Sequence, residues 1–136
     1  MQLDCGTQHL QYIHSRDEQF MNTLKKATED DDLEMFQSLK PNDQDLYWGF
    51  YMLTHNYLKN KNIESKIALY CVENVDNCGF GDQMLRYLIK DNKSNTLAPL
   101  KVGFDKITPF QQKNLIKFAE ESNNNCTPII KSWSSI

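Results

Sequence analysis

One stretch of the chain constrains its fold more than any other. Residues 46–53 carry apolar side chains on nearly every side of a helix, and four of the eight residues are aromatic. Asn42 or Asp43 supplies an N-cap, and the helix is predicted to run to about Asn60. A helix that is apolar all round is normally central in its fold or presents a binding surface. The sequence therefore predicts a helical protein built around this segment.

Helical periodicity also precedes this segment. Apolar residues at positions 10–24 share one helix face, and that helix begins either near Thr7 or at Ser15, which opens a capping-box pattern. Acidic residues at 29–32 suit the first turn of a second helix, which Pro41 ends. These patterns favour two helices before the aromatic segment.

The second half of the chain gives more mixed signals. Residues 63–73 are amphipathic as a helix, with a strand at 67–72 as the alternative. A Gly-rich break at 76–81 is followed by Asp82 as a predicted N-cap. Thr108, with a proline directly after it, is typical of a helix start.

These elements predict an all-α, or mostly α, single compact bundle of about five or six helices. We expect residues 1–126 to form one domain, residues 91–105 a long loop with a short extended segment near 97–104, and residues 127–136 a docked or flexible tail. Residues 31–39 resemble the second helix of helical repeats. Because no second copy of that pattern is found, the sequence predicts no repeat.

Composition excludes several classes of protein. A chain of 136 residues with 40% apolar side chains and a net charge of −3 fits one globular domain. The sequence pI of about 5.6 disfavours a dedicated nucleic-acid binder. No run approaches the roughly 18–20 apolar residues of a membrane span. We therefore expect neither nucleic acid nor membrane as a partner.

The N-terminus has no basic and apolar segments of a signal peptide, and the four cysteines match no zinc or C-x-x-C redox spacing. Both features favour free thiols and a cytoplasmic location. Residues 120–136, an acidic pair followed by a polar tail, resemble the C-terminal signals of bacterial effectors. That resemblance implies an alternative, which is signal-less export into a host cell.

One cysteine has a sequence context of its own. Asn77, Cys78 and Gly79 precede a predicted helix and resemble the nucleophile turn of papain-like and transglutaminase-like folds. The resemblance implies Cys78 as nucleophile, and the base would then come from His55, His14 or His9, of which we take His55 as the candidate. In those families the histidine follows the cysteine, whereas no histidine follows position 55 here.

Other side chains give no chemistry of this kind. Cys5, His9 and His14 supply only part of a zinc ligand set, and no phosphate-binding or dinucleotide-binding motif is found, so we expect no metal and no cofactor.

Charge and aromatic residues are unevenly distributed along the chain. Residues 1–50 carry ten acids and four bases, whereas residues 51–136 carry eight acids and eleven bases. We therefore predict a small non-enzymatic protein–protein interaction module, an adaptor, regulator or inhibitor, steered by its acidic half. The partner is another protein or a second copy of the chain, and a thiol enzyme with Cys78 and His55 is the alternative. The predicted partner-binding residues are aromatic: Tyr47, Trp48, Tyr51 and Tyr57.

Overall fold

The computed structural model describes residues 5–134, which form ten helices and no strand. The helices are α1 (Cys5–His14), α2 (Glu18–Asp30), α3 (Leu33–Ser38), α4 (Asp43–His55), α5 (Lys66–Asn74), α6 (Cys78–Lys90), α7 (Ser94–Leu97), α8 (Lys101–Lys106), α9 (Pro109–Ser122) and α10 (Thr127–Trp133).

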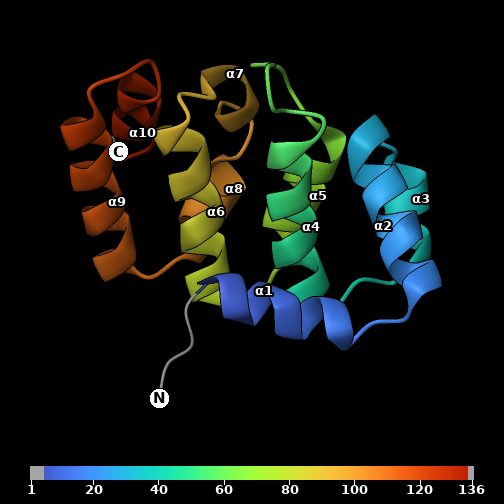
Figure 1. Ribbon diagram of the computed structural model, residues 1–136. Helices are drawn as coiled ribbons and strands as arrows, with labels where there is room; N and C mark the ends of the chain where they lie inside the picture. Colours follow the sequence, from blue (N-terminus) through green and yellow to red (C-terminus); the bar gives the residue numbers. More distant parts are fainter. Residues whose placement is uncertain (1–4, 135–136) are drawn as a thin grey trace.

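The helices are arranged as a row of pairs (Figure 1). The longer helices α2, α4, α6 and α9 stand side by side and run in the same direction. Each packs against a shorter helix that follows it: α3, α5, α8 and α10 respectively. Stacking of helix pairs in one direction is the architecture of helical-repeat proteins, in which each unit contacts mainly its neighbours. Helix α1 is outside this pattern and runs along the row, across the N-terminal ends of the longer helices.

Polar side chains tie each pair to the next at regular intervals. Asp31 accepts hydrogen bonds from the first backbone N–H groups of α5, at 3.0 and 3.1 Å. Asn62 accepts one from the backbone N–H of Asn95 at 2.8 Å. Asn92 accepts one from the backbone N–H of Asn125 at 3.0 Å. The tying residues stand at positions 31, 62 and 92, so the chain repeats its structure although it does not visibly repeat its sequence.

Two lysines tie the helices in the opposite sense, because their side chains donate hydrogen bonds to backbone carbonyl groups. The Lys106 ammonium group, in α8, donates to three carbonyl groups at the end of α5, at 2.6 to 3.3 Å. Lys93 donates to two carbonyl groups in the loop after α4, at 2.6 and 2.7 Å. Cations at carbonyl-rich helix ends are favourable because those carbonyls lack intrahelical partners. These ties help to fix the positions of the shorter helices, which form one layer of the fold, whereas α2, α4, α6 and α9 form the other.

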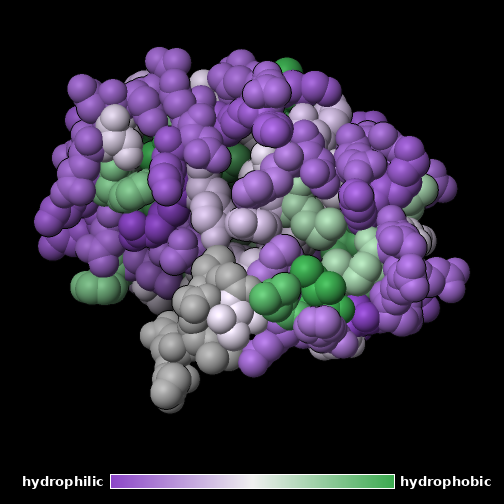
Figure 2. All heavy atoms as spheres, viewed as in Figure 1, coloured by the Kyte–Doolittle hydropathy of each residue, from purple (hydrophilic) through white to green (hydrophobic). Residues whose placement is uncertain are grey.

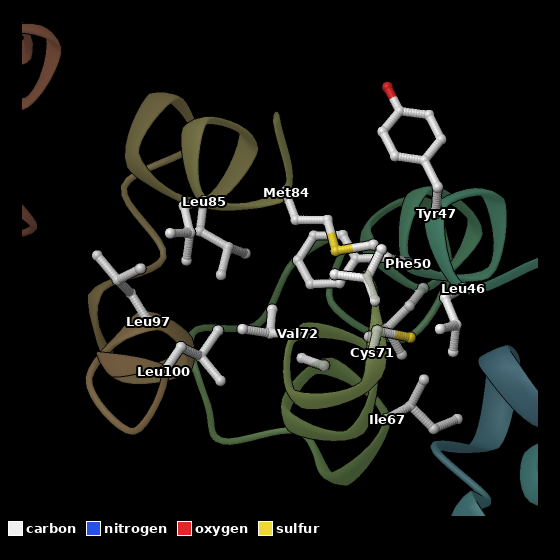
Figure 3. Packing of buried hydrophobic residues seen from close by; sticks show 14 of the residues in the cluster. Leu46, Tyr47, Phe50, Ile67, Cys71, Val72, Met84, Leu85, Leu97 and Leu100 are labelled. Carbon is white, nitrogen blue, oxygen red and sulfur yellow. The ribbon is translucent and has the colours of Figure 1, made fainter. Parts of the chain in front are cut away.

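The core lies between the two layers (Figure 3). Phe50 from α4, Cys71 from α5 and Met84 from α6 meet there, and all three are fully buried. Two glycines allow the helices to approach closely. A Cβ on Gly49 would lie 2.7 Å from a Phe36 ring carbon, and one on Gly103 would lie 2.2 Å from a Val72 methyl group.

The mostly helical, compact fold predicted from the sequence is confirmed, and the predicted number of five or six helices is wrong. Part of the difference is at residues 91–105, predicted as a loop with an extended segment at 97–104. That region contains α7 and α8, of four and six residues. Helices so short carry no periodic pattern, and tertiary contacts decide their structure. The residues predicted as a tail include α10, in which Ile130 is buried.

The predicted helix starts have mixed outcomes. Asn42 caps α4 and Thr108 caps α9 as predicted, each in a capping box. Asp82 was predicted to cap α6, which instead begins at Cys78 with Asn77 as the N-cap. The prediction failed because glycines that looked like a chain break lie inside the first turns of the helix. Helix α4 ends at His55, short of the predicted Asn60.

Candidate functional site

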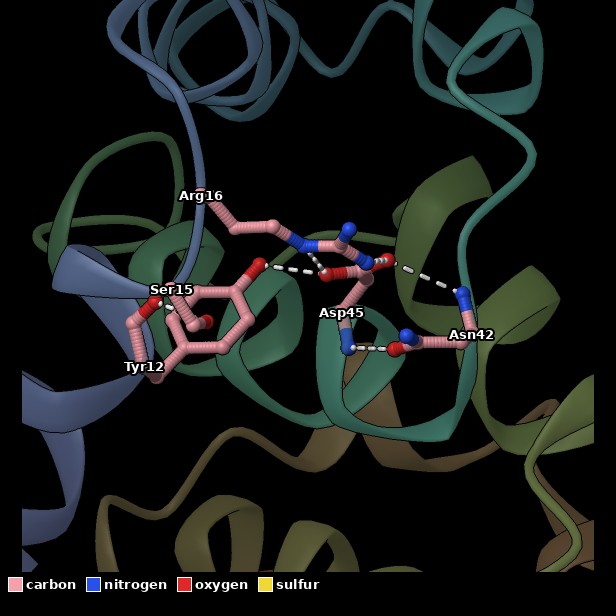
Figure 4. Close-up of polar contacts among 5 residues, drawn as sticks. All are labelled: Tyr12, Ser15, Arg16, Asn42 and Asp45. Carbon is pink, nitrogen blue, oxygen red and sulfur yellow. Dashed lines mark hydrogen bonds and ion pairs between the residues drawn. The ribbon is translucent and has the colours of Figure 1, made fainter.

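Helix α1 is fastened across the row by one buried carboxylate (Figure 4). Asp45, in the first turn of α4, is fully buried. Its Oδ1 accepts hydrogen bonds from the Tyr12 hydroxyl at 2.7 Å and from Arg16 Nε at 3.0 Å. Its Oδ2 accepts one from the Asn42 backbone N–H at 3.0 Å and pairs with Arg16 Nη2. Four donors, two of them from the Arg16 guanidinium cation, satisfy a buried charge that would otherwise be costly. Burial raises the pKa of Tyr12, and Asp45 raises it further, so this phenol remains a donor.

Aromatic rings fill the junction between α1 and the row. Trp48 stacks with His9 from α1, with ring centroids 4.7 Å apart. Tyr47 stacks with Phe80 from α6 at 4.7 Å, and Figure 3 shows it pointing away from the aliphatic core. We call the whole set the aromatic cluster: His9, Tyr12, Tyr47, Trp48, Tyr51, Phe80 and Tyr87.

Three of the four predicted partner-binding residues meet in this cluster. Tyr47 and Trp48 are only 8% and 4% exposed, because α1 and α6 cover them, and Tyr51 is half-buried beside them. Tyr57 lies apart, beyond the end of α4, with the Lys61 ammonium group 4.3 Å from its ring centroid. Tyr47 and Trp48 therefore reach the surface at the edge of a cleft rather than on a flat surface.

That cleft lies between α1 and the N-terminal halves of α4 and α6, and its volume is about 580 Å³. Rings of the aromatic cluster form part of its wall. None of the described residues that line it is charged. We call it the amide cleft, after five side chains that line it: Gln8, Gln11, Gln44, Asn77 and Gln83.

The two residues of the predicted thiol site lie at opposite ends of the neighbouring helices α4 and α6. The Cys78 thiol, in the first turn of α6, donates to the Lys106 carbonyl at 3.7 Å. His55 is the last residue of α4, and its Nδ1 lies 2.9 Å from the Tyr51 carbonyl. Because α4 and α6 run parallel, the two side chains lie at opposite ends, separated by about 18 Å of helix. The structure does not bring Cys78 and His55 together.

The other predicted histidines lie on α1. His9 packs in the aromatic cluster, and its Nε2 is buried without a hydrogen-bond partner among the described residues. Burial lowers the pKa of His9, and the nearby His55 lowers it further. Within the described residues, no group of three or more potential ligands is placed to hold a metal ion. The side chain of Cys5 lies outside the described part of the chain.

Apolar side chains also reach the surface at this junction. Figure 2 shows a hydrophobic patch over α1 and the adjoining parts of α4 and α2, on a face that is otherwise mostly hydrophilic. Leu10, on the outer side of α1, is 58% exposed. The patch therefore lies on the same part of the fold as the amide cleft.

Of the aromatic residues predicted to bind a partner, Tyr47 and Trp48 line the cleft, whereas its amide side chains were not among the predicted residues. Glutamines are frequent on helix surfaces, so nothing in the sequence marks Gln44 or Gln83, which converge only when α4 and α6 pack in parallel.

Comparison of the chain with models of protein families, with curated proteins and with solved structures finds no match. Over the described part of the chain, no helix has both the length and the apolarity needed to cross a membrane.

Proposed function

We propose that the protein is a non-enzymatic binding module that holds a partner protein at the amide cleft. The observation that carries this proposal is the cleft itself, in which polar amides surround the edge of an aromatic cluster. Binding sites combine an aromatic or apolar surface with a few convergent polar groups in this way. Tyr and Trp are also the residues that most often dominate the energy of protein interfaces.

The rigidity of the site supports the same proposal. Asp45 fixes α1, and the tied helix pairs fix the relative positions of α4 and α6. A cleft whose walls are held in place before binding loses little conformational entropy when a partner enters. Arrays of helix pairs commonly present such preformed surfaces.

The uneven charge supports a role in the encounter. Residues 17–40, which include the α2–α3 pair at one end of the row, carry seven acids and three bases. An acidic end beside the cleft accelerates association with a basic partner and adds little to affinity.

Affinity capture from lysate with three matched baits tests the proposal. The baits are the native chain, Gln44→Lys in the cleft, and Asn60→Lys in the turn after α4, which is exposed and outside both the cleft and the acidic end. We expect one partner to be captured by the native chain and Asn60→Lys, and to be depleted about tenfold with Gln44→Lys.

The melting temperatures of the three baits should agree within about 2 °C, which shows that a difference in capture does not arise from unfolding of a bait. Equal capture by all three baits would overturn the cleft as the site. If the captured partner is the chain itself, light scattering of the purified protein will show the second copy.

A further inference from the structure

We infer that the amide cleft takes an uncharged, extended peptide segment of the partner and binds its main chain. This inference rests on the proposed binding function and adds the chemistry of the ligand. It follows from the charge of the cleft, from the geometry of its amides and from the state of its aromatic rings.

The first argument is the lack of charge. Charged residues make up 24% of the chain, yet none of the described residues lining the cleft carries a charge. A charged ligand side chain entering this cleft would give up part of its hydration without finding a counter-charge among the described residues that line it. An uncharged segment avoids that penalty, and the ligand is therefore neutral where it meets the cleft.

The second argument is the hydrogen-bonding capacity of the amides. Gln11, Gln44 and Gln83 are exposed and come from three different helices, α1, α4 and α6. Each glutamine offers one acceptor oxygen and an NH₂ donor. An extended chain offers unpaired N–H and C=O groups at every residue, whereas a helix has bonded most of its own. The cleft therefore matches an extended chain better than a helix.

The third argument separates a peptide from a neutral sugar, which also bonds well to amides. Sugars bind on the open face of an aromatic ring. Here the Trp48 ring has His9 stacked at 4.7 Å and Tyr12 at 6.1 Å, and Trp48 is 4% exposed. A ring that is covered in this way cannot stack on a sugar, whereas small apolar side chains of a peptide need no open ring face. The volume of about 580 Å³ is that of a site for one short segment.

Selection from a displayed library of random ten-residue peptides tests this inference. The bait is the full chain carrying Trp133→Phe, which leaves Trp48 as the remaining tryptophan of the two. We expect the enriched peptides to be uncharged over a stretch of about four residues and to be bound through Trp48, seen as a change in its fluorescence. Raising salt from about 0.05 to about 0.5 M should alter Kd less than twofold, because no ion pair forms.

Substitutions in the cleft locate the binding. Gln44→Lys and Gln83→Lys should each weaken the selected peptides about tenfold, and Asn60→Lys should leave their Kd unchanged. Replacing two central peptide bonds by N-methylated ones should weaken binding by a similar factor, because donors of the main chain are lost.

Some outcomes overturn the inference and leave the proposed function intact. Enriched peptides with charged centres, or a Kd that rises more than tenfold with salt, would show a charged ligand. Uncharged oligosaccharides that change Trp48 fluorescence in the absence of peptide binding would show a sugar site. Failure of both the peptide selection and the partner capture would instead remove the proposed function itself.

Discussion

The contacts that hold the helix pairs to one another differ from those that hold helix α1 to the row. In the row, Asp31, Asn62 and Asn92 each tie one pair to the next, so similar hydrogen bonds recur along the row and stabilise it together. Helix α1 belongs to no pair, and its attachment to the row depends on Asp45 and on a few aromatic rings. The row thus determines the fold, while α1 completes the cleft, and damage to the two regions should have different consequences.

The largest effect is expected from a close approach inside the row. Gly103→Ala places a methyl group 2.2 Å from a Val72 methyl group, which neither helix can accept without moving. We expect about 3 kcal/mol of destabilisation and a melting temperature lower by roughly 10 °C. Because pairs stack in series, chemical denaturation should show the loss in the whole chain.

Gly81→Ala is the matched control for this substitution. Its Cβ would make ordinary contacts of 3.7 Å with Ile107 and Val75, and alanine favours the helix. An equal loss in both variants would show that helix α6 and α8 glycines are needed for some reason other than close packing.

The second prediction concerns the fastening of α1. Asp45→Ala removes the acceptor of Tyr12 and Arg16, at an expected cost of about 2 kcal/mol, because Arg16 remains partly exposed to water. Hydrogen exchange should accelerate in α1 and remain slow in α6 and α9. Uniform acceleration along the chain would contradict the separation of α1 from the row.

The sequence predicted the local features of the fold and missed the contacts between helix pairs. Capping residues such as Asn42 and Thr108 act locally, and their helix starts were predicted correctly. The repeat was missed because the tying residues are single Asp or Asn positions in different loops. Their positions, 31, 62 and 92, with a further asparagine at 123, were the available signal.

The site was predicted only in part for a related reason. Tyr47 and Trp48 stood out because aromatic residues are dense in their segment. Burial of Trp48 by α1 depends on a contact between residues far apart in sequence, such as Tyr12 with Asp45. No local sequence pattern predicts which residues of the row helix α1 will cover.

The third prediction tests one tie of the row. Asp31→Gly removes the carboxylate that caps α5 while accommodating the left-handed backbone at this position, where φ is 50°. We expect a loss of about 1 kcal/mol, measured by urea denaturation. Asn123→Gly is the control, since Asn123 has a φ of 47° and caps no following helix with its side chain in the described structure. Equal effects would assign the loss to backbone entropy rather than to the tie.

The smallest effect is expected from acid, and it should appear in α1 alone. Burial, followed by the nearby His55, lowers the pKa of His9 below its ordinary 6.5, so the folded chain favours the neutral ring. The unfolded chain then binds more protons, and the contribution of His9 to α1 docking is complete above pH 6.5 and is lost as pH falls through the folded pKa. Between about pH 7.5 and about pH 5.5, Trp48 fluorescence in the Trp133→Phe background should report loosening of α1. His9→Phe keeps a ring against Trp48 and should abolish this dependence. If the dependence persists in His9→Phe, protonation of His9 is not its cause, and the docking of α1 through His9 is not the pH-sensitive contact.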